Sequence, residues 1–335
     1  MKTTKKKIIA SVAIALSLFG IAGCANSKTS SGKKPLTIYT NADTEAIDVM
    51  KATLDNNGFK NDYKFQEFGS SDLNAKVVAE GKNMSADLVT LSTFYLDSAQ
   101  KNSHAFVDWN TPKDGVNKRE SFQAPILGNE GAIIINTDAL KQAKLPEPKS
   151  IKDLAAPIYK GQLSFPDLNG STTGWLMVQA LIQQYGEKEA QTILTGMIKN
   201  AGSMITQSGS APLQNVESGQ VAVAFGLRAQ GEKDTDKMPL KVVEPTEGNF
   251  VLTESVAVVN HKTLNSEAEK AAELLATKTR TDMIKQYPVA LFKGEQAPVD
   301  KSTSTEHIKF FNQPLTTDLL KTHIAIFDKV KAEAN

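Results

Sequence analysis

Two short stretches of the chain combine hydroxyl side chains with glycine where a helix is expected to begin. In the first, NGSTTGW (169–175), three hydroxyl residues lead directly into an apolar run. The second, QSGSAP (207–212), ends in a proline that suits a first helical turn. Unpaired N–H groups and the positive dipole end make such starts suitable for phosphate, phosphonate, sulfate or carboxylate. The candidate anion ligands are Ser171, Thr172, Thr173, Ser208, Gly209 and Ser210.

Ordinary helix capping is the alternative explanation for both stretches. Asn169 or Ser171 can cap the first helix, and a serine can cap the second. Capping needs only one such residue, whereas each stretch carries a cluster. Arg228, in FGLRAQGEK, is an optional source of positive charge for the anion, or else a solvated helix residue.

Carboxylates elsewhere in the chain could meet a cationic group of the same ligand. Open α/β sheets place ligands at the carboxyl ends of their strands. Asn41 and Asp43 follow the expected strand 36–40, and Thr93 follows the expected strand 86–92. Asp43 can instead cap the next helix. The candidate partners for an amine are Asp43, Glu45 and Glu254, and the aromatic residues that could wall the pocket, or simply fill the core, are Phe94, Tyr95 and Trp175.

The elements that position these residues form two α/β series. Strand patterns at 36–40, 62–69 and 86–92 alternate with helical patterns, which favours a largely parallel sheet. A second series runs from about residue 150, and a mostly helical tail starts near residue 264. Apolar strands at 131–136 and 251–259 are the expected crossings between two lobes. Two lobes joined by crossing strands leave a cleft, a favoured place for a small ligand.

The first residues predict export. Four lysines among residues 1–7 precede an apolar stretch that ends in IAGC, with small residues before the only cysteine, Cys24. This resembles the lipobox of bacterial lipoproteins, in which the peptide is cut before a cysteine that carries the lipid. A transmembrane anchor is the alternative. We expect a signal peptide over 1–23 and a flexible lipid-anchored linker over 24–35, rich in Ser, Lys and Gly.

Composition and motifs argue against several other classes of protein. The early lysines account for the formal net charge of +1, so no basic face is indicated for nucleic acid. The sequence has no G-x-S-x-G, Walker loop or H-E-x-x-H, and Cys24 is its only cysteine. The four histidines are scattered without metal-ligand spacing. We therefore expect a protein without enzymatic activity, cofactor or metal.

Several stretches together resemble the extracytoplasmic solute-binding proteins of bacterial ABC importers, in particular the ferric-ion-binding-like cluster. They are LTIYTNADTEA, ADLVTLS, NEGAIIIN, YKGQLSFPDLNGSTTG, SGSAPLQNVESGQVAVAFG and TESVAVV. The resemblance implies a periplasmic-binding-protein-like fold of type II, with two α/β lobes that close on a solute. Residues 36–131 plus 255–335 would form lobe 1, and residues 132–254 lobe 2. The loaded, monomeric protein would dock on a permease at the outer face of the cell membrane.

The same resemblance also implies which ligand to expect. Ferric-ion binders of this cluster carry adjacent tyrosines after the strand that here is followed by GLRAQ, and their early histidine corresponds to Asp43. FGLRAQ is similar to members that bind 2-aminoethylphosphonate, a small zwitterion. In that case the two hydroxyl-glycine stretches hold the phosphonate, and Asp43, Glu45 or Glu254 meets the amine. The alternatives are a metal-ion carrier of the same fold and, ranked last, a surface phosphoester hydrolase.

Overall fold

The computed structural model describes residues 34–116, 120–298 and 308–334. The predicted signal peptide, Cys24 and the linker up to residue 33 lie outside these residues. Within the described residues, no helix is both long enough and apolar enough to cross a membrane.

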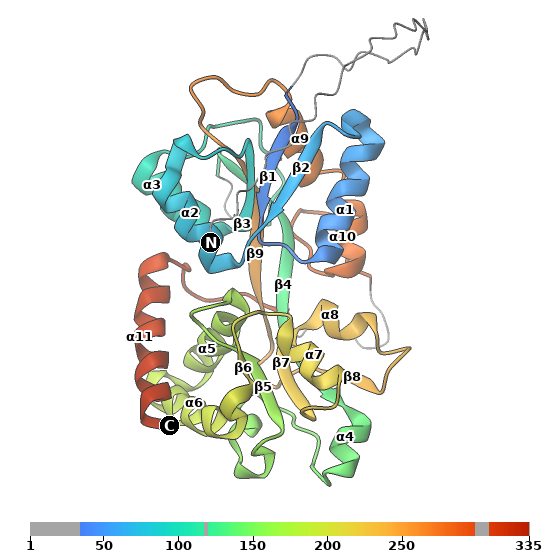
Figure 1. Ribbon diagram of the computed structural model, residues 1–335, viewed down its shortest axis with the longest axis vertical. Coiled ribbons are helices and arrows are strands. Elements are labelled where there is room, and N and C mark those ends of the chain that lie inside the picture. Colours follow the sequence, from blue (N-terminus) through green and yellow to red (C-terminus); the bar gives the residue numbers. More distant parts are fainter. Residues whose placement is uncertain (1–33, 117–119, 299–307, 335) are drawn as a thin grey trace, which may run out of the picture. The chain divides into compact units, whose positions relative to one another are not determined.

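A mixed sheet of ten strands, counted over the described residues, runs through both lobes (Figure 1). Its order is β2-β1-β3-β9-β4-β7-β5-β6, with β10 beside β9 and β8 beside β4. The strands β1–β3 are parallel to one another, as are β5–β7. The bounds are β1 Leu36–Thr40, β2 Tyr63–Glu67, β3 Leu88–Ser92, β4 Gln123–Asn136, β5 Leu163–Pro166, β6 Ile205–Thr206, β7 Val223–Leu227, β8 Leu240–Val243, β9 Asn249–Val258 and β10 Ile308–Lys309.

Two long antiparallel strands, β4 and β9, connect the lobes. The first half of β4 pairs with β9, and its second half, 131–136, pairs with β7 and β8. The expected crossings at 131–136 and 251–259 therefore fall on these two strands. The strand β4 begins earlier than expected, at Gln123, because the stretch PILGNEG pairs with β9 despite its proline and glycines.

Helices cover both parts of the sheet (Figure 1). Around β1–β3 lie α1 Thr44–Leu54, α2 Ser70–Glu80, α3 Thr93–Ser103, α9 Ala268–Ala276 and α10 Arg280–Gln286. Around β5–β8 lie α4 Thr137–Gln142, α5 Thr172–Tyr185, α6 Glu187–Ala201, α7 Ala211–Glu217, α8 Arg228–Lys233 and α11 Thr317–Ala334. We call the two groups of elements lobe 1 and lobe 2.

The helix α5 is the central helix of lobe 2. Ten consecutive residues, 172–181, are buried, and its sequence is apolar on all sides. The helix α6 is amphipathic instead, and its expected apolar face at Ala190, Ile193, Leu194 and Met197 is buried. A helix as buried as α5 has little freedom to move within its lobe, so its first turn is a fixed support for a ligand.

The C-terminal helix α11 packs on lobe 2, whereas its sequence position suggested lobe 1 with the rest of 255–335. Leu320, Phe327 and Val330 are buried in the same apolar cluster as residues of α5 and α6. Its first turn reaches lobe 1, where Thr317 shares a hydrogen bond of 3.1 Å with Ser98 of α3. The helix packs where its apolar face can be buried, which is against α6, although the segment before it in the sequence belongs to lobe 1 (Figure 1).

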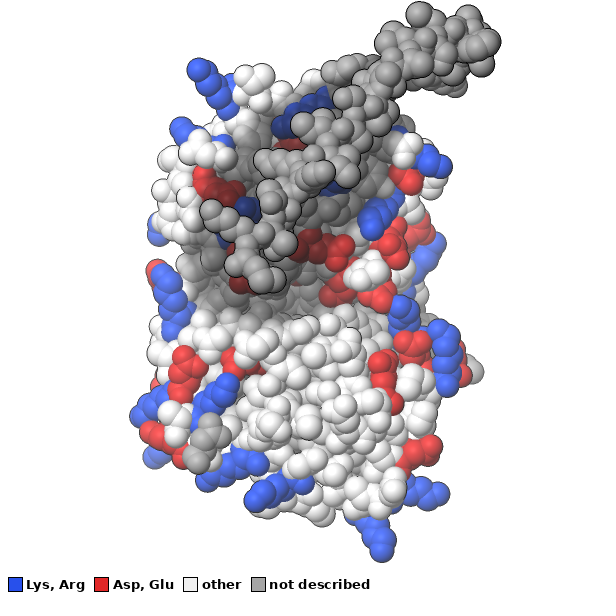
Figure 2. Space-filling model, viewed as in Figure 1, with Lys and Arg blue, Asp and Glu red and all other residues white. Residues whose placement is uncertain are grey.

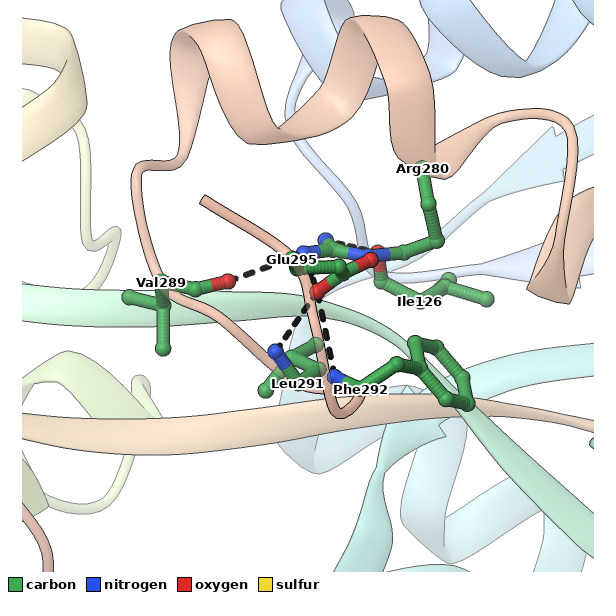
Figure 3. Close-up of polar contacts among 6 residues, drawn as sticks. All are labelled: Ile126, Arg280, Val289, Leu291, Phe292 and Glu295. Atoms are coloured by element: carbon green, nitrogen blue, oxygen red, sulfur yellow. Dashed lines mark hydrogen bonds and ion pairs between the residues drawn. The ribbon is translucent and has the colours of Figure 1, made fainter. Parts of the chain in front are cut away.

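A buried arginine fixes lobe 1 to the start of β4 (Figure 3). The register of β4 shifts between Pro125 and Leu127, so Ile126 cannot pair regularly with β9. Arg280 Nη1 donates to the Ile126 carbonyl at 2.9 Å, and its Nε and Nη2 bind the two carboxylate oxygens of Glu295 at 2.8 Å each. Nη2 also donates to the Val289 carbonyl at 2.8 Å. The guanidinium thus joins the bulge to the chain that follows α10.

We expect Arg280→Lys to lower the free energy of unfolding by about 2 kcal/mol, because one ammonium cannot replace the planar fork and leaves buried acceptors unpaired. Urea denaturation measures this loss. Lys285→Arg on the same helix is the control, since Lys285 pairs with Asp282 on the exposed surface. Its effect should stay within about 0.5 kcal/mol. Equal stability of the Arg280→Lys variant would contradict the role of the fork.

Candidate functional site

A cavity of about 630 Å³ lies between the two lobes. The turn after β1 and the first turns of α1 and α2 line it from lobe 1, and residues of α5, α7 and α8 line it from lobe 2. Nine of the predicted ligand residues are among those that line it: Asn41, Asp43, Ser171, Thr172, Thr173, Ser208, Gly209, Ser210 and Glu254.

The first turn of α5 presents hydroxyl groups at the lobe 2 side of this cavity. Ser171 has the extended backbone of an N-cap residue, and its side chain accepts a hydrogen bond of 3.2 Å from the Thr173 N–H. Capping therefore does occur, but it uses only Ser171. Gly174 lets this turn approach the preceding strand, because a Cβ there would lie 2.7 Å from the Pro166 carbonyl oxygen.

The second stretch, 207–210, packs directly against the first. A Cβ on Gly209 would lie 2.7 Å from Thr173 Oγ1 and 2.8 Å from Ser171 Oγ. A Cβ on Gly170 would lie 2.3 Å from the Gln207 carbonyl oxygen. Glycine at 170 and 209 is thus what allows the two turns to touch. Together they form one surface rich in hydroxyl groups, with Ser208 and Ser210 sharing a hydrogen bond at 3.0 Å.

Lobe 1 and the crossing strands present acceptors at the other end of the cavity. Glu254, on β9, is buried, and its Oε1 accepts from Asn41 Nδ2 at 2.9 Å and from Asn129 Nδ2 at 3.2 Å. Because both amide nitrogens face Glu254, the amide oxygens point elsewhere. Among the described residues, Asn41 Oδ1, Asn129 Oδ1 and Glu254 Oε2 are buried atoms without a hydrogen-bond partner. A ligand with N–H donors would satisfy these three oxygens.

The electrostatics of this end favour a cation. Burial, and secondly the charge of Asp43, raises the pKa of Glu254 to about 7. Burial likewise raises the pKa of Asp43, whose carboxylate accepts a hydrogen bond of 3.0 Å from the Tyr287 hydroxyl and does not cap α1. Figure 2 shows acidic side chains gathered at mid-height on the face it displays. An ammonium group here would relieve the repulsion between the two carboxylates.

Two contacts join the lobes at the rim of the cavity. Lys233 of α8 forms an ion pair with Glu45 of α1, and both residues line the cavity. Ser71 Oγ of α2 donates to the Asn169 carbonyl at 2.7 Å. The lobes thus lie close enough to enclose a small solute. Glu45, one of the three candidate amine partners, is engaged by this lysine.

Two predicted ligand residues lie outside the cavity lining, contrary to expectation. Thr93 Oγ1 donates to the Thr253 carbonyl at 3.0 Å and lines a separate, more apolar cavity behind β9. Arg228 is 2% exposed and lies among Glu130, Glu232 and Glu244 at 3.4–4.0 Å. Its charge is already compensated inside the protein, so Arg228 is a structural residue. The aromatic rings of Phe94 and Trp175 pack edge to face in the core, with their centroids 4.9 Å apart.

Other lining residues carried too weak a signal in the sequence to be predicted. They are Ser70, Asn129, Gln207, Gln230 and Lys233. Asn129 comes just before the expected strand 131–136, and Gln230 and Lys233 lie in the short polar helix α8. They are identified only by their place in the cavity lining. Over the residues that the structure describes, no group of three or more His, Cys, Asp or Glu could hold a metal ion.

Comparison with known proteins places this arrangement in a family. A family model described as bacterial extracellular solute-binding protein matches residues 64–311. An uncharacterized protein of Haemophilus influenzae is 29% identical over 262 residues, which cover 74% of this chain and 73% of the relative.

Several solved structures share the fold. The periplasmic binding protein AfuA from Actinobacillus pleuropneumoniae, with fructose-6-phosphate bound, has a TM-score of 0.73 and 20% identity over 89% of this chain and 98% of its own. A periplasmic thiamin-binding protein has a TM-score of 0.74 and 18% identity, covering 90% and 98%. Iron-bound HitA from Pseudomonas aeruginosa has a TM-score of 0.66 and 18% identity, covering 90% and 99%. The fold is thus the two-lobed periplasmic-binding-protein fold predicted from the sequence, and the chain belongs to the bacterial extracellular solute-binding proteins, a family of binding proteins rather than enzymes.

Proposed function

We propose that this protein captures a small zwitterionic phosphonate, such as 2-aminoethylphosphonate, and delivers it to the permease of an ABC importer. In this proposal the mature chain is a monomer tethered through a lipid on Cys24 to the outer face of the cell membrane. The ligand lies between the lobes, with its phosphonate on lobe 2 and its amine on Glu254. The similar structures do not select a ligand by themselves, since one holds fructose-6-phosphate, one is iron-bound and one is named for thiamin.

The observation that carries the proposal is the separation of donors and acceptors within one cavity. The hydroxyl groups of 171–173, Ser208 and Ser210 lie on the lobe 2 side, and Asn41, Asn129 and Glu254, whose oxygens have no partner among the described residues, lie on the other. A zwitterion is the simplest ligand that matches both ends. Each charge-assisted hydrogen bond to an ionised group is worth roughly 1.5–3 kcal/mol.

The charge of the cavity also argues against a plain anion. Its lining includes the carboxylates of Asp43, Glu45, Glu217, Asp234 and Glu254, against the single lysine Lys233 among the described residues. Inorganic phosphate or sulfate would gain the hydroxyl contacts but would face the acidic end without compensation. A ligand with its own ammonium turns that repulsion into attraction.

Isothermal titration calorimetry against 2-aminoethylphosphonate, ethylphosphonate, phosphate, sulfate and ferric ion tests the proposal. We expect 2-aminoethylphosphonate to bind at least about tenfold more tightly than any of the other four, because it alone satisfies both ends of the cavity. Tight binding of ferric ion without affinity for any anion would instead support a metal carrier of the same fold.

A further inference from the structure

The turn that leads into α5 is built around a buried carboxylate. Asp167 is 1% exposed, and its Oδ1 accepts from the Asn169 backbone N–H at 2.8 Å and from Asn169 Nδ2 at 3.1 Å. Its backbone carbonyl accepts from the Ser171 N–H at 3.1 Å. Asp167 therefore shapes the turn 167–171 that presents Ser171 and the first turn of α5 to the cavity.

The C-terminal helix α11 holds this turn from outside the cavity. Lys331 Nζ donates to Asp167 Oδ2, and Asp328 Oδ1 accepts from Asn169 Nδ2 at 2.8 Å. Two turns earlier in α11, His323 Nδ1 accepts from the indole N–H of Trp175, within α5, at 2.8 Å. Side chains of α11 thus form hydrogen bonds with both the turn 167–171 and the helix α5 that follows it. None of these three α11 residues is among those that line the cavity.

The charge of Asp167 is a problem for an anion site, because it lies four residues before Ser171 at the same end of α5. Burial raises the pKa of Asp167, but the hydrogen bonds from Lys331 and Asn169 outweigh burial and hold the pKa below its usual value. The carboxylate is therefore ionised at neutral pH. Left alone, this charge would occupy the positive end of the α5 dipole and repel an incoming phosphonate.

We propose that Lys331 is a positioning residue for the anion end of the site, which it serves by neutralising Asp167, whose unpaired charge would otherwise disturb the turn 167–171. This inference rests on the proposed function, since it requires that the first turn of α5 receives a negatively charged group. Lys331 does not touch the ligand. It acts through Asp167, so its effect depends on whether that carboxylate is present.

A single variant without the lysine charge and a double variant without both charges distinguish this electrostatic role from purely mechanical support of the turn. Lys331→Met should weaken 2-aminoethylphosphonate binding roughly tenfold in calorimetry, because Asp167 keeps its charge without a partner. The double variant Asp167→Asn, Lys331→Met should return to within about twofold of the parent, since asparagine keeps the oxygen that accepts from Asn169. Lys329→Met on the exposed side of α11, where Lys329 pairs only loosely with Glu333 at 4.0 Å, should leave the affinity unchanged.

Two results would overturn the inference. An unchanged affinity in Lys331→Met would show that the charge of Asp167 does not reach the ligand. A double variant as weak as, or weaker than, the single one would show that Lys331 acts as a mechanical brace without an electrostatic role.

A ligand-free measurement keeps the inference separate from the proposed function. If no anion in the panel binds the parent protein, the proposed function fails, and amide hydrogen exchange over 169–175 still tests the turn. Lys331→Met should speed exchange there by at least about tenfold, and the double variant should restore it. Unchanged exchange in Lys331→Met would overturn the positioning role.

Discussion

Replacement of Glu254 by glutamine should weaken the binding of 2-aminoethylphosphonate by at least about 100-fold, a loss of about 3 kcal/mol. Glu254 lines the cavity, and its buried Oε2 has no hydrogen-bond partner among the described residues. Glutamine keeps the shape and an oxygen for Asn41 and Asn129, but it replaces the charged acceptor by an amide. The ammonium would then lose its charged partner in a region where water cannot compensate.

Ethylphosphonate is the matched control ligand, because it has the same phosphonate and no amine. Its affinity for Glu254→Gln should equal or exceed that for the parent protein, since one negative charge has been removed near the anion. Isothermal titration with both ligands on both proteins gives the coupling between the amine and the carboxylate. If Glu254→Gln keeps the parent's preference for the amino compound, the amine does not bind at Glu254.

The same pair of ligands gives an expected pH dependence. Burial and the Asp43 charge raise the pKa of Glu254 to about 7 in the empty site. A bound ammonium favours the ionised carboxylate, so ligand binding should release protons near neutral pH. The ratio of the two affinities should therefore rise with pH by up to about tenfold per pH unit below pH 7 and flatten near about pH 8. The ratio measured for Glu254→Gln should lack this rise.

The stability of the protein without ligand should change with pH in the opposite direction, falling as the pH rises. Because burial raises the folded pKa of Glu254 to about 7, well above its ordinary value, its contribution to stability is fully present at low pH and is lost as the pH rises through about 7. Glu254→Gln should therefore melt at a higher temperature than the parent at about pH 8, and the gain should shrink towards about pH 5. Glu254 is thus expected to strengthen ligand binding while it lowers the free energy of unfolding of the protein without ligand.

Periodicity and turn chemistry predicted most of the fold. The strands expected at 36–40 and 86–92 are found as β1 and β3, although β3 begins at Leu88, and both are buried at every position. The helix α6 follows from its periodic pattern, because it buries one face of apolar residues. The early part of β4 was missed since Pro125 and Gly128 are typical of a turn, and only pairing with β9 makes them a strand. The place of α11 depends on which lobe offers an apolar surface, and the order of the chain contains no information on that choice.

The site was predicted where several chemically similar residues are neighbours in sequence. Hydroxyl clusters at 171–173 and 208–210 stand out in this way, and the structure brings both to one cavity. Single residues were harder to predict. Arg228 and Glu254 look equally suited to a ligand, yet one lies among three carboxylates and the other keeps a free oxygen at the cavity. That difference arises from tertiary contacts, such as Arg228 with Glu130 and Asn129 with Glu254, which the sequence around each residue does not show.

Substitution of Gly209 by alanine should weaken the binding of every anion in the panel by roughly 100-fold, and loss of the Ser171 cap should lower the free energy of unfolding by about 1 kcal/mol. The backbone of Gly209 does not have the positive φ that favours glycine, so alanine adds no backbone strain. Its methyl group would instead lie 2.7 Å from Thr173 Oγ1 and 2.8 Å from Ser171 Oγ. Both hydroxyls would have to turn away, and the phosphonate would lose two charge-assisted hydrogen bonds.

Ser218→Ala is the control, because this exposed residue directly follows α7 and does not line the cavity, whereas Gly209 lies before the start of the same helix. Its affinity and its melting temperature should match those of the parent. The loss in Gly209→Ala should be equal for 2-aminoethylphosphonate and ethylphosphonate, because both place the same phosphonate on this surface, whereas the loss in Glu254→Gln falls on the amino compound alone. A Gly209→Ala variant that binds both ligands as tightly as the parent would mean that the negatively charged group lies elsewhere in the cavity.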